Sequence, residues 1–420
     1  MEKIKEINEI ARHCLKCSNP SCVKFCPLGN SIPQILEAVS NHNIEEAQSI
    51  LLKTSLFPFV CGSLCDHSKT CYGGCILTKA KKDGVIFYEV EKYLGKTLDE
   101  TLFTKEKQTP SEKKVAIIGA GVSGLASAIV LAQKGYVVDL FEKNDCIGGV
   151  ITESLPDFRF DDQMIHVYEK ILKKLDVHVY YQKEFGKNLI LSELNTYDIV
   201  IFAMGTALSK TILAKNQSIF DGLDILKKSK HHENMIQNQE GIVIGGGNVA
   251  MDVARTLVRN HNLVKVVYRR DLANAPASPK EIEEAIKEGV VFEELKAPIE
   301  AVFEKGVLTG LLVEKTRLEE NSNLENNSKR KNFVLTGEKE VVTGSFIVEA
   351  IGQDADYHVL KAAYPAFFDE RGYVKNPGVF QTDLGNIIAF TGDYYLGAST
   401  FAKALANTLD TLHRMEEMIK

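Results

Sequence analysis

The chain has 420 residues, which is too long for one ordinary hydrophobic core and long enough for two or three packed domains. Its composition, 45% hydrophobic and 25% charged, is close to that of soluble globular proteins, and its net charge of -6 gives no bias toward nucleic acid. No apolar run reaches the roughly 18 residues of a membrane span, and the N-terminus lacks the apolar core of a signal peptide. We therefore expect a multidomain cytoplasmic protein with no nucleic-acid partner and no membrane span.

Residues 1–108 are predicted to form a separate helical module. Apolar residues recur at steps of three and four in SIPQILEAVSNHNIEEAQSILLKT, as in amphipathic helices. The polar stretch FTKEKQTPSEKK, which contains Pro110, follows this module and precedes an apolar strand. We place the module boundary near Thr109.

Eight of the nine cysteines lie in this module, and only Cys146 lies elsewhere. They form two runs, C-x2-C-x4-C-x3-C-P (Cys14, Cys17, Cys22, Cys26) and C-x3-C-x5-C-x3-C (Cys61, Cys65, Cys71, Cys75). In a chain without a leader, metal ligation is a better explanation than disulfides. The spacing suits two [4Fe-4S] clusters, in which the fourth cysteine of a run can serve the other cluster. Two structural zinc sites of four cysteines each remain an alternative.

From Lys113 onward the pattern predicts an α/β fold with parallel sheets. Short β-branched strands alternate with helices, and two series of them begin with glycine-rich turns, at Gly119 and Gly245. The Asn-rich segment EENSNLENNSKRKN separates two further strands, and we interpret it as an exposed hairpin loop.

The first glycine-rich turn predicts a dinucleotide site. Gly119, Gly121 and Gly124 follow a strand and open a helix, where free amides and the helix dipole stabilise a pyrophosphate. Glu142 ends the next strand and can bind ribose hydroxyls, so the site suits FAD or NAD. Gly148 and Gly149 suggest a second close approach of the backbone to the ligand.

The C-terminal motif AFTGDYYLGASTFAKALANTL favours FAD at this first site. Gly392-Asp393 is predicted to end a strand and precede a helix. Such a pair alone is usually an ordinary turn. However, the motif resembles that of flavoproteins with two dinucleotide sites, and this resemblance implies that Asp393 meets the flavin ribitol.

The second glycine-rich turn predicts a second dinucleotide site. Gly245 and Gly247 repeat the spacing, with Ala250 at the third position, and Asn248 is a further candidate cofactor-binding residue. The next strand ends in Arg269 and Arg270, which bind phosphate well, so this site should prefer NADPH over NADH. A solvated basic strand end is the alternative.

Two such sites predict hydride transfer from nicotinamide to flavin, which requires orientation but no catalytic side chain. We therefore assign no catalytic residue. Since no second cysteine lies outside the module, a dithiol reductase is disfavoured, and Cys146 is expected to be a packed side chain.

The chain resembles the NADPH-oxidising small (beta) subunit of glutamate synthase and its relatives, which include the N-terminal half of dihydropyrimidine dehydrogenase. The resemblance runs along nearly the whole chain through CLKC…CVKFCPLGNSIP, VAIIGAGVSGLASA, LPDFRF, IGGGNVAMDVART, VYRRD, AIGQ and FTGD. It implies an FAD-binding domain in two parts, 109–225 and 346–420, around an inserted NADPH-binding domain, 226–345. It also implies that Cys14, Cys17, Cys22 and Cys75 hold one cluster, and Cys26, Cys61, Cys65 and Cys71 the other.

This resemblance implies single-electron transfer from FAD through the clusters to a larger catalytic subunit or another acceptor protein. Three alternatives stay open. The first is an NADH-dependent small subunit of pyrimidine dehydrogenase, against which Arg269 and Arg270 argue. The second is a self-sufficient flavin reductase for a small molecule, and the third is a zinc-binding scaffold.

Overall fold

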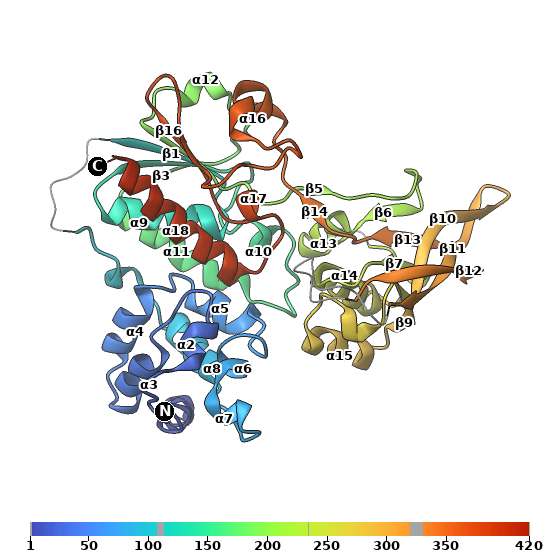
Figure 1. Ribbon diagram of the computed structural model, residues 1–420, viewed down its shortest axis with the longest axis horizontal. Coiled ribbons are helices and arrows are strands. Elements are labelled where there is room, and N and C mark those ends of the chain that lie inside the picture. Colours follow the sequence, from blue (N-terminus) through green and yellow to red (C-terminus); the bar gives the residue numbers. More distant parts are fainter. Residues whose placement is uncertain (1, 107–112, 234, 320–330, 420) are drawn as a thin grey trace. The chain divides into compact units, whose positions relative to one another are not determined.

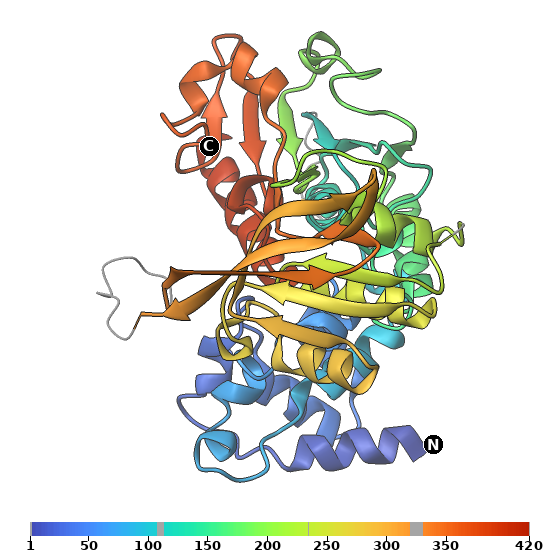
Figure 2. The same cartoon turned by 90° about the vertical axis from the view of Figure 1, so that its right-hand side faces the viewer.

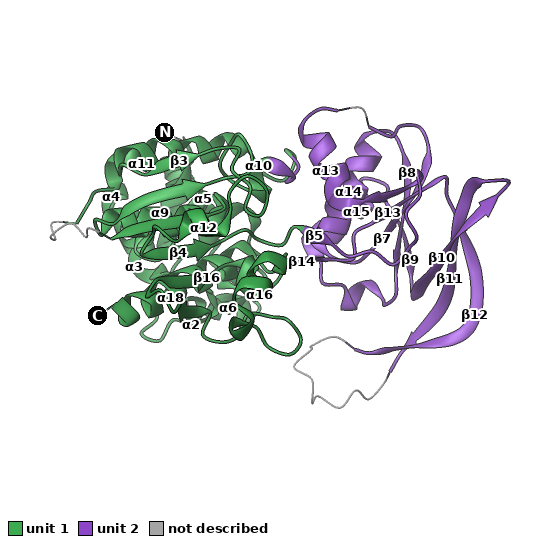
Figure 3. Cartoon of the chain, turned by 90° about the horizontal axis from the view of Figure 1, so that it is seen from above, with its two compact units in different colours: residues 1–152, 157–207, 355–420 green, residues 153–156, 208–354 purple. Residues whose placement is uncertain are grey.

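The computed structural model describes residues 2–106, 113–233, 235–319 and 331–419. They form two compact units, one of residues 1–152, 157–207 and 355–420 and the other of residues 153–156 and 208–354 (Figure 3). The expected boundary at Thr109 and residues 320–330 of the expected hairpin loop lie outside the described residues. Among the described residues, no helix is both long enough and apolar enough to cross a membrane.

The cysteine-rich module is helical, as its apolar spacing predicts. Asn43 caps one helix by accepting a hydrogen bond from the Glu46 backbone N–H at 3.2 Å. Ile35, Leu51 and Val90 are completely buried where three of the helices meet. The helices are α1 (Glu2–Arg12), α2 (Ser21–Phe25), α3 (Ile32–Ser40), α4 (Ile44–Leu52), α5 (Pro58–Leu64), α6 (Cys71–Gly74), α7 (Ile76–Lys79), α8 (Phe87–Lys96) and the 3-10 helix η1 (Glu100–Leu102).

The rest of the first unit is built on a sheet of order β15-β16-β4-β1-β2-β3, in which only β15 is antiparallel (Figure 1). Its strands are β1 (Lys114–Ile118), β2 (Val137–Phe141), β3 (His178–Tyr180), β4 (Ile199–Phe202), β15 (Val379–Gln381) and β16 (Ile387–Phe390). The associated helices are α9 (Val122–Gln133), α10 (Val150–Glu153), η2 (Asp162–Ile165), α11 (His166–Lys174), α12 (Leu191–Leu194), α16 (His358–Ala363), η4 (Pro365–Phe367), α17 (Asp393–Leu396) and α18 (Phe401–Ile419). The chain leaves this sheet after β4 and returns to it at β15 and β16.

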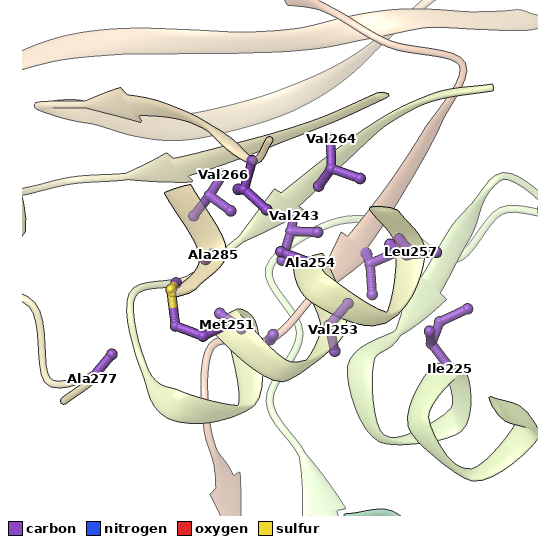
Figure 4. Close-up of a cluster of buried hydrophobic side chains, with 14 of the residues drawn as sticks. Ile225, Val243, Met251, Val253, Ala254, Leu257, Val264, Val266, Ala277 and Ala285 are labelled. Carbon is purple, nitrogen blue, oxygen red and sulfur yellow. The ribbon is translucent and has the colours of Figure 1, made fainter. Parts of the chain in front are cut away.

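The second unit has its own parallel sheet, of order β6-β13-β7-β8-β9. Val243 and Val266 from its strands pack against Met251, Ala254 and Leu257 of one helix (Figure 4). The predicted hairpin strands are antiparallel, and their sheet appears in orange in Figure 2. The elements are β5 (Leu208–Ser209), β6 (Ile219–Asp221), α13 (Gly222–Lys230), β7 (Glu240–Ile244), α14 (Asn248–Arg259), β8 (Leu263–Tyr268), η3 (Leu272–Asn274), α15 (Pro279–Lys287), β9 (Val291–Glu294), β10 (Lys296–Glu304), β11 (Val307–Leu318), β12 (Phe333–Thr343), β13 (Phe346–Glu349) and β14 (Gln353–Asp354).

The second unit extends beyond the range 226–345 expected from the sequence. β6 and the first turn of α13 precede residue 226, and β13 follows residue 345. The reason is strand pairing, because β13 pairs in parallel with both β6 and β7 and so belongs to the same sheet.

A buried ion network joins α14 to α15 in this unit. Arg255 on α14 is almost fully buried, and its guanidinium donates to Glu281 at 2.7 Å and to Glu288 at 2.7 Å. The more exposed Arg259 also donates to Glu288 at 2.7 Å. Partial burial acts to raise the pKa of Glu288, but the hydrogen bonds from Arg255 and Arg259 hold it below its usual value.

We predict that Arg255→Ala destabilises this unit by about 3–5 kcal/mol, because it removes the buried cation from Glu281 and leaves Glu288 with the more exposed Arg259. Arg259→Ala is the matched control and should cost less than about 1 kcal/mol, since that guanidinium is exposed. Urea unfolding of both variants measures the difference. Equal costs for the two substitutions would contradict the prediction.

Candidate functional site: two glycine loops and two cysteine sets

The first glycine loop leads from β1 into α9, where the sequence predicts a dinucleotide. Gly119 has φ +101°, and a Cβ there would lie 2.7 Å from the Ala203 carbonyl oxygen. A Cβ on Gly124 would lie 1.8 Å from the Gly119 carbonyl oxygen. Gly121 precedes the first residue of α9. Glycine is required at Gly119 and Gly124, and the first amides of α9 point out of the helix toward the place where a pyrophosphate would lie.

Glu142 and Gly149 lie against this loop. Glu142 is buried after β2, and its carboxylate accepts from the Ala120 backbone N–H at 2.7 Å and from the Asn144 N–H at 3.0 Å. Gly149 has φ +57°, and a Cβ there would lie 2.8 Å from the Gly121 Cα. Two loops thus meet backbone to backbone at Gly121 and Gly149.

Gly392 and Asp393 lie beside the same loop although they are about 270 residues away in sequence. Gly392 has φ +62°, and a Cβ there would lie 2.1 Å from the Ser123 Oγ on α9. Its N–H donates to the Asn407 side chain at 2.8 Å. Burial raises the pKa of Asp393, whose carboxylate accepts from Ser399 at 2.6 Å. The structure therefore brings Gly392 against the start of α9, and Asp393 follows it directly in the chain.

The second glycine loop leads from β7 into α14. Gly245 has φ +142°, and a Cβ there would lie 2.3 Å from the Ala350 carbonyl oxygen. Gly247 precedes α14, and the side chain of Asn248 accepts from the Ser278 backbone N–H at 3.0 Å. In this structure Asn248 therefore holds the loop before α15 against the glycine loop.

Arg269 and Arg270 follow β8 and share one aromatic neighbour. The Cζ atoms of their guanidinium groups lie 5.1 Å and 5.2 Å from the ring centroid of Phe333. Arg270 Nε also donates to the Lys331 carbonyl oxygen at 2.8 Å. The ring orients two permanent positive charges at the end of the strand that follows the glycine loop, which is suitable for a phosphate.

One cysteine set, which we call the outer set, consists of Cys14, Cys17, Cys22 and Cys75. These residues line a cavity of about 280 Å³. Burial, with a smaller contribution from the neighbouring Cys14, Cys75 and Cys17, raises the pKa of Cys22 to about 11. Thiolates at this place therefore require a nearby cation, which a bound cluster would provide.

The other set, which we call the inner set, consists of Cys26, Cys61, Cys65 and Cys71. Burial raises the pKa of Cys65 to about 11, and the Cys26 thiol also acts on it. Burial likewise raises the pKa of Cys61 and of Cys71. Each set, as we define it, takes three cysteines from one run and one from the other. The thiols of Cys14, Cys17 and Cys75 act on the pKa of Cys22, and those of Cys26 and Cys65 act on that of Cys71, so the cysteines of each set lie near one another.

The outer set has room for a bound group. Its four cysteines, together with Cys71, line the cavity of about 280 Å³. A [4Fe-4S] cluster is held by four thiolates spread around it, so the four thiolates at this cavity would fit one.

Glu91, on α8, is a neighbour of the inner set that the sequence analysis missed. Burial raises the pKa of this carboxyl to about 8, against hydrogen bonds from Ser55 and Asn30. Asn30 Nδ2 donates to it at 2.9 Å and Ser55 Oγ at 3.2 Å. A negative charge on Glu91 raises the pKa of all four thiols of the inner set, those of Cys26, Cys61, Cys65 and Cys71. The only signal in the sequence is an acidic residue next to Val90 on the buried face of an amphipathic helix.

The inner set lies next to the first dinucleotide fold. The Phe57 ring, at the start of the helix that carries Cys61, stacks on Tyr168 of α11 at 4.3 Å between centroids. Tyr168 Oη donates to the Leu56 carbonyl oxygen at 2.8 Å. Helix α5 also contacts α18, the helix that follows Gly392 and Asp393, and Figure 1 shows these helices side by side.

Comparison with known families identifies both parts of the chain. The family described as dihydropyrimidine dehydrogenase domain II, 4Fe-4S cluster, matches residues 2–102. The pyridine nucleotide-disulphide oxidoreductase family matches residues 113–405. The chain thus has an iron–sulfur domain and an oxidoreductase domain.

Curated relatives match along most of the chain. The glutamate synthase [NADPH] small chain of Halomonas elongata is 32% identical over 94% of this chain and 87% of its own length. The same subunit of Escherichia coli is 29% identical over 94% of this chain and 88% of its own. The beta subunit of the NADP(+)-dependent formate dehydrogenase of Moorella thermoacetica is 29% identical over 92% of this chain and 58% of its own length.

Solved structures share the fold. FprA of Mycobacterium tuberculosis, solved in complex with NADPH, aligns with a TM-score of 0.58 over 74% of this chain and 86% of its own, at 18% identity. Thioredoxin reductase of Lactococcus lactis aligns with a TM-score of 0.51 over 73% of this chain and 100% of its own, also at 18% identity.

We predict that Gly124→Ala abolishes flavin retention at the first site, because the new methyl group collides with the Gly119 carbonyl oxygen. The first glycine loop must then shift away from the position in which it binds the flavin cofactor. Flavin absorbance per chain should therefore fall more than about tenfold. Gly289→Ala is the control: at φ +98° it strains the backbone, but its Cβ meets no heavy atom within 4 Å and it lies outside the glycine loop, so it reports on backbone strain alone. Equal flavin content in both variants would contradict the role of Gly124.

Proposed function

This chain belongs to the family of glutamate synthase small chains, and we propose that it transfers electrons from NADPH through FAD and two [4Fe-4S] clusters to a partner protein. Its domains establish it as an oxidoreductase with an iron–sulfur domain. The observation that carries the finer proposal is the packing of α5, which bears a cysteine of the inner set, on α11 and α18 of the first dinucleotide fold.

The first glycine loop is the proposed FAD site. The tight turn at Gly119, Gly121 and Gly124 frees backbone amides for a pyrophosphate, and Glu142 can accept from ribose hydroxyls. Gly149 would let a second backbone segment approach the ligand. Gly392 lies against α9, so Asp393, which follows it, would lie near the same ligand. Bound FAD would supply hydride acceptance and single-electron release.

The second glycine loop is the proposed NADPH site. Gly245 and Gly247 would let the backbone approach the NADPH pyrophosphate closely. The side chain of Asn248 holds the loop before α15 in place. Arg269 and Arg270 would bind the 2′-phosphate that distinguishes NADPH from NADH, because guanidinium groups stay charged and bind phosphate in a bidentate manner.

The eight module cysteines are the proposed cluster ligands, with the outer and inner sets holding one cluster each. The inner set would receive electrons first, since it adjoins the first dinucleotide fold, and the outer set would release them. The partner would be a larger catalytic subunit, since the relatives include a small chain and a beta subunit of larger enzymes, or a separate acceptor protein.

Replacement of both arginines tests the nicotinamide assignment. Arg269→Ala with Arg270→Ala should lower kcat/KM for NADPH about 10–100-fold and leave that for NADH nearly unchanged, since only the phosphate contact is lost. Initial rates with ferricyanide as acceptor measure both constants. Arg317→Ala, at an exposed arginine of β11, is the control. An unchanged ratio in the double variant would refute the assignment.

Iron content and cysteine variants test the cluster assignment. We expect about eight iron and eight sulfide ions per chain, and about half of each in Cys75→Ser and in Cys14→Ser. Because both residues belong to the outer set, the two variants should lose the same electron paramagnetic resonance signal, and Cys71→Ser should lose the other one. Cys146→Ser is the control and should retain both signals. A colourless protein that contains zinc would refute the proposal.

A further inference from the structure

Two segments of the cysteine module are free of acidic residues. Residues 10–36 contain Arg12, Lys16 and Lys24 and no Asp or Glu. Residues 67–82 contain Lys69, Lys79, Lys81 and Lys82 and again no Asp or Glu. The whole chain has a net charge of -6, so positive charge is concentrated in these two segments. The same segments supply all four cysteines of the outer set.

The structure brings these segments together. The Ser21 hydroxyl, on α2, donates to the Gly74 carbonyl oxygen at 2.5 Å, and a Cβ on Gly74 would lie 2.7 Å from the Cβ of Phe25. Lys79 Nζ lies 4.3 Å from the centroid of the Phe25 ring and donates to Ser21 Oγ at 3.3 Å. Helices α2, α6 and α7 therefore present one continuous surface.

Exposed apolar side chains lie on these helices, at Phe25 and Ile76, and before α2, at Leu15. Leu15 is 61% exposed, Ile76 is 49% exposed and Phe25 is 47% exposed. Leu15 follows Cys14 and Ile76 follows Cys75, and both line the cavity of the outer set. We call this surface the basic face; it consists of Leu15, Lys24, Phe25, Ile76, Lys79, Lys81 and Lys82.

Acidic side chains near the basic face neutralise little of it. Glu37 forms an ion pair with Lys16 at 2.7 Å, so we leave Lys16 out of the face. Asp83 is exposed and adjoins Lys82 in sequence. Lys79 lies over the Phe25 ring, and Lys24, Lys81 and Lys82 are exposed near it in sequence, so positive charge accompanies the exposed apolar side chains. Protein interfaces often combine an apolar core with a polar rim.

We propose that the basic face is the docking surface of an acidic electron-accepting protein. The inference rests on the proposed function, in which the outer set releases electrons. An acidic surface of the partner would be attracted to the lysines of the basic face, and Leu15, Phe25 and Ile76 would exclude water from the contact. Oxidation of one NADPH to NADP+ and a proton yields two electrons, which reduce two molecules of a one-electron acceptor.

The test uses the intact holoenzyme and an acidic plant-type [2Fe-2S] ferredoxin as probe. Lys24→Glu with Lys82→Glu reverses two charges of the face. The matched control is Lys305→Glu with Lys339→Glu, two exposed lysines near or on the strands of the antiparallel sheet. Binding of the ferredoxin without NADPH is measured at low and high salt, and NADPH-driven reduction of the ferredoxin is measured beside that of ferricyanide.

We expect the face variant to raise Kd for the ferredoxin at least about tenfold at low salt and to flatten its salt dependence. The control should stay within about twofold of the parent. Ferricyanide reduction and both cluster signals should not change in the face variant, which separates docking from an effect of the lysines on the clusters.

Equal binding by the parent and the face variant would overturn the proposal, as would an equal loss in the control. Tighter binding of anionic vesicles or duplex DNA than of the ferredoxin, with the same lysine dependence, would also overturn it. Lysine-dependent binding of the ferredoxin without its reduction by NADPH would support the docking surface and refute the proposed electron transfer.

Discussion

The pairing of β16 with β4 is the constraint on which the rest of the first unit depends. The chain leaves the sheet after Phe202, forms the second unit and returns to place Phe390 beside Phe202 in parallel register. Since the carboxyl ends of parallel strands meet at one edge of a sheet, this pairing delivers Gly392 to the start of α9, against Ser123. The first site is therefore complete only when the C-terminal segment has joined the sheet.

The C-terminal segment that returns to the sheet also contacts the cysteine module. Helix α18, which follows Gly392 and Asp393, contacts both α9 and α5. Helix α5 carries Cys61, and its first residues stack on α11 through Phe57 and Tyr168. One C-terminal segment thus contributes to the candidate flavin site and supports the inner cysteine set beside it. This arrangement explains how two local motifs far apart in sequence become neighbours in one compact unit.

Local motifs could be predicted from the sequence, and long-range partners could not. The glycine loops and their strands were predictable because Gly119, Gly124 and Gly245 encode a turn within a few residues. Phe333, which orients Arg269 and Arg270, lies more than 60 residues beyond them and has no motif of its own. Strand β6 is short and joins its sheet only through β13. Zinc and iron–sulfur clusters could not be separated by spacing alone, because both take four thiolates.

The positions of the two cysteine sets give the proposed relay a direction. Helix α5, which carries Cys61 of the inner set, contacts α18, and the Phe57 ring before it stacks on Tyr168 of α11 in the first dinucleotide fold. The outer set lines a cavity whose walls include Leu15 and Ile76, side chains that are 61% and 49% exposed. Because electrons pass between neighbouring centres, we infer that the inner set takes electrons from the flavin and the outer set releases them at the basic face.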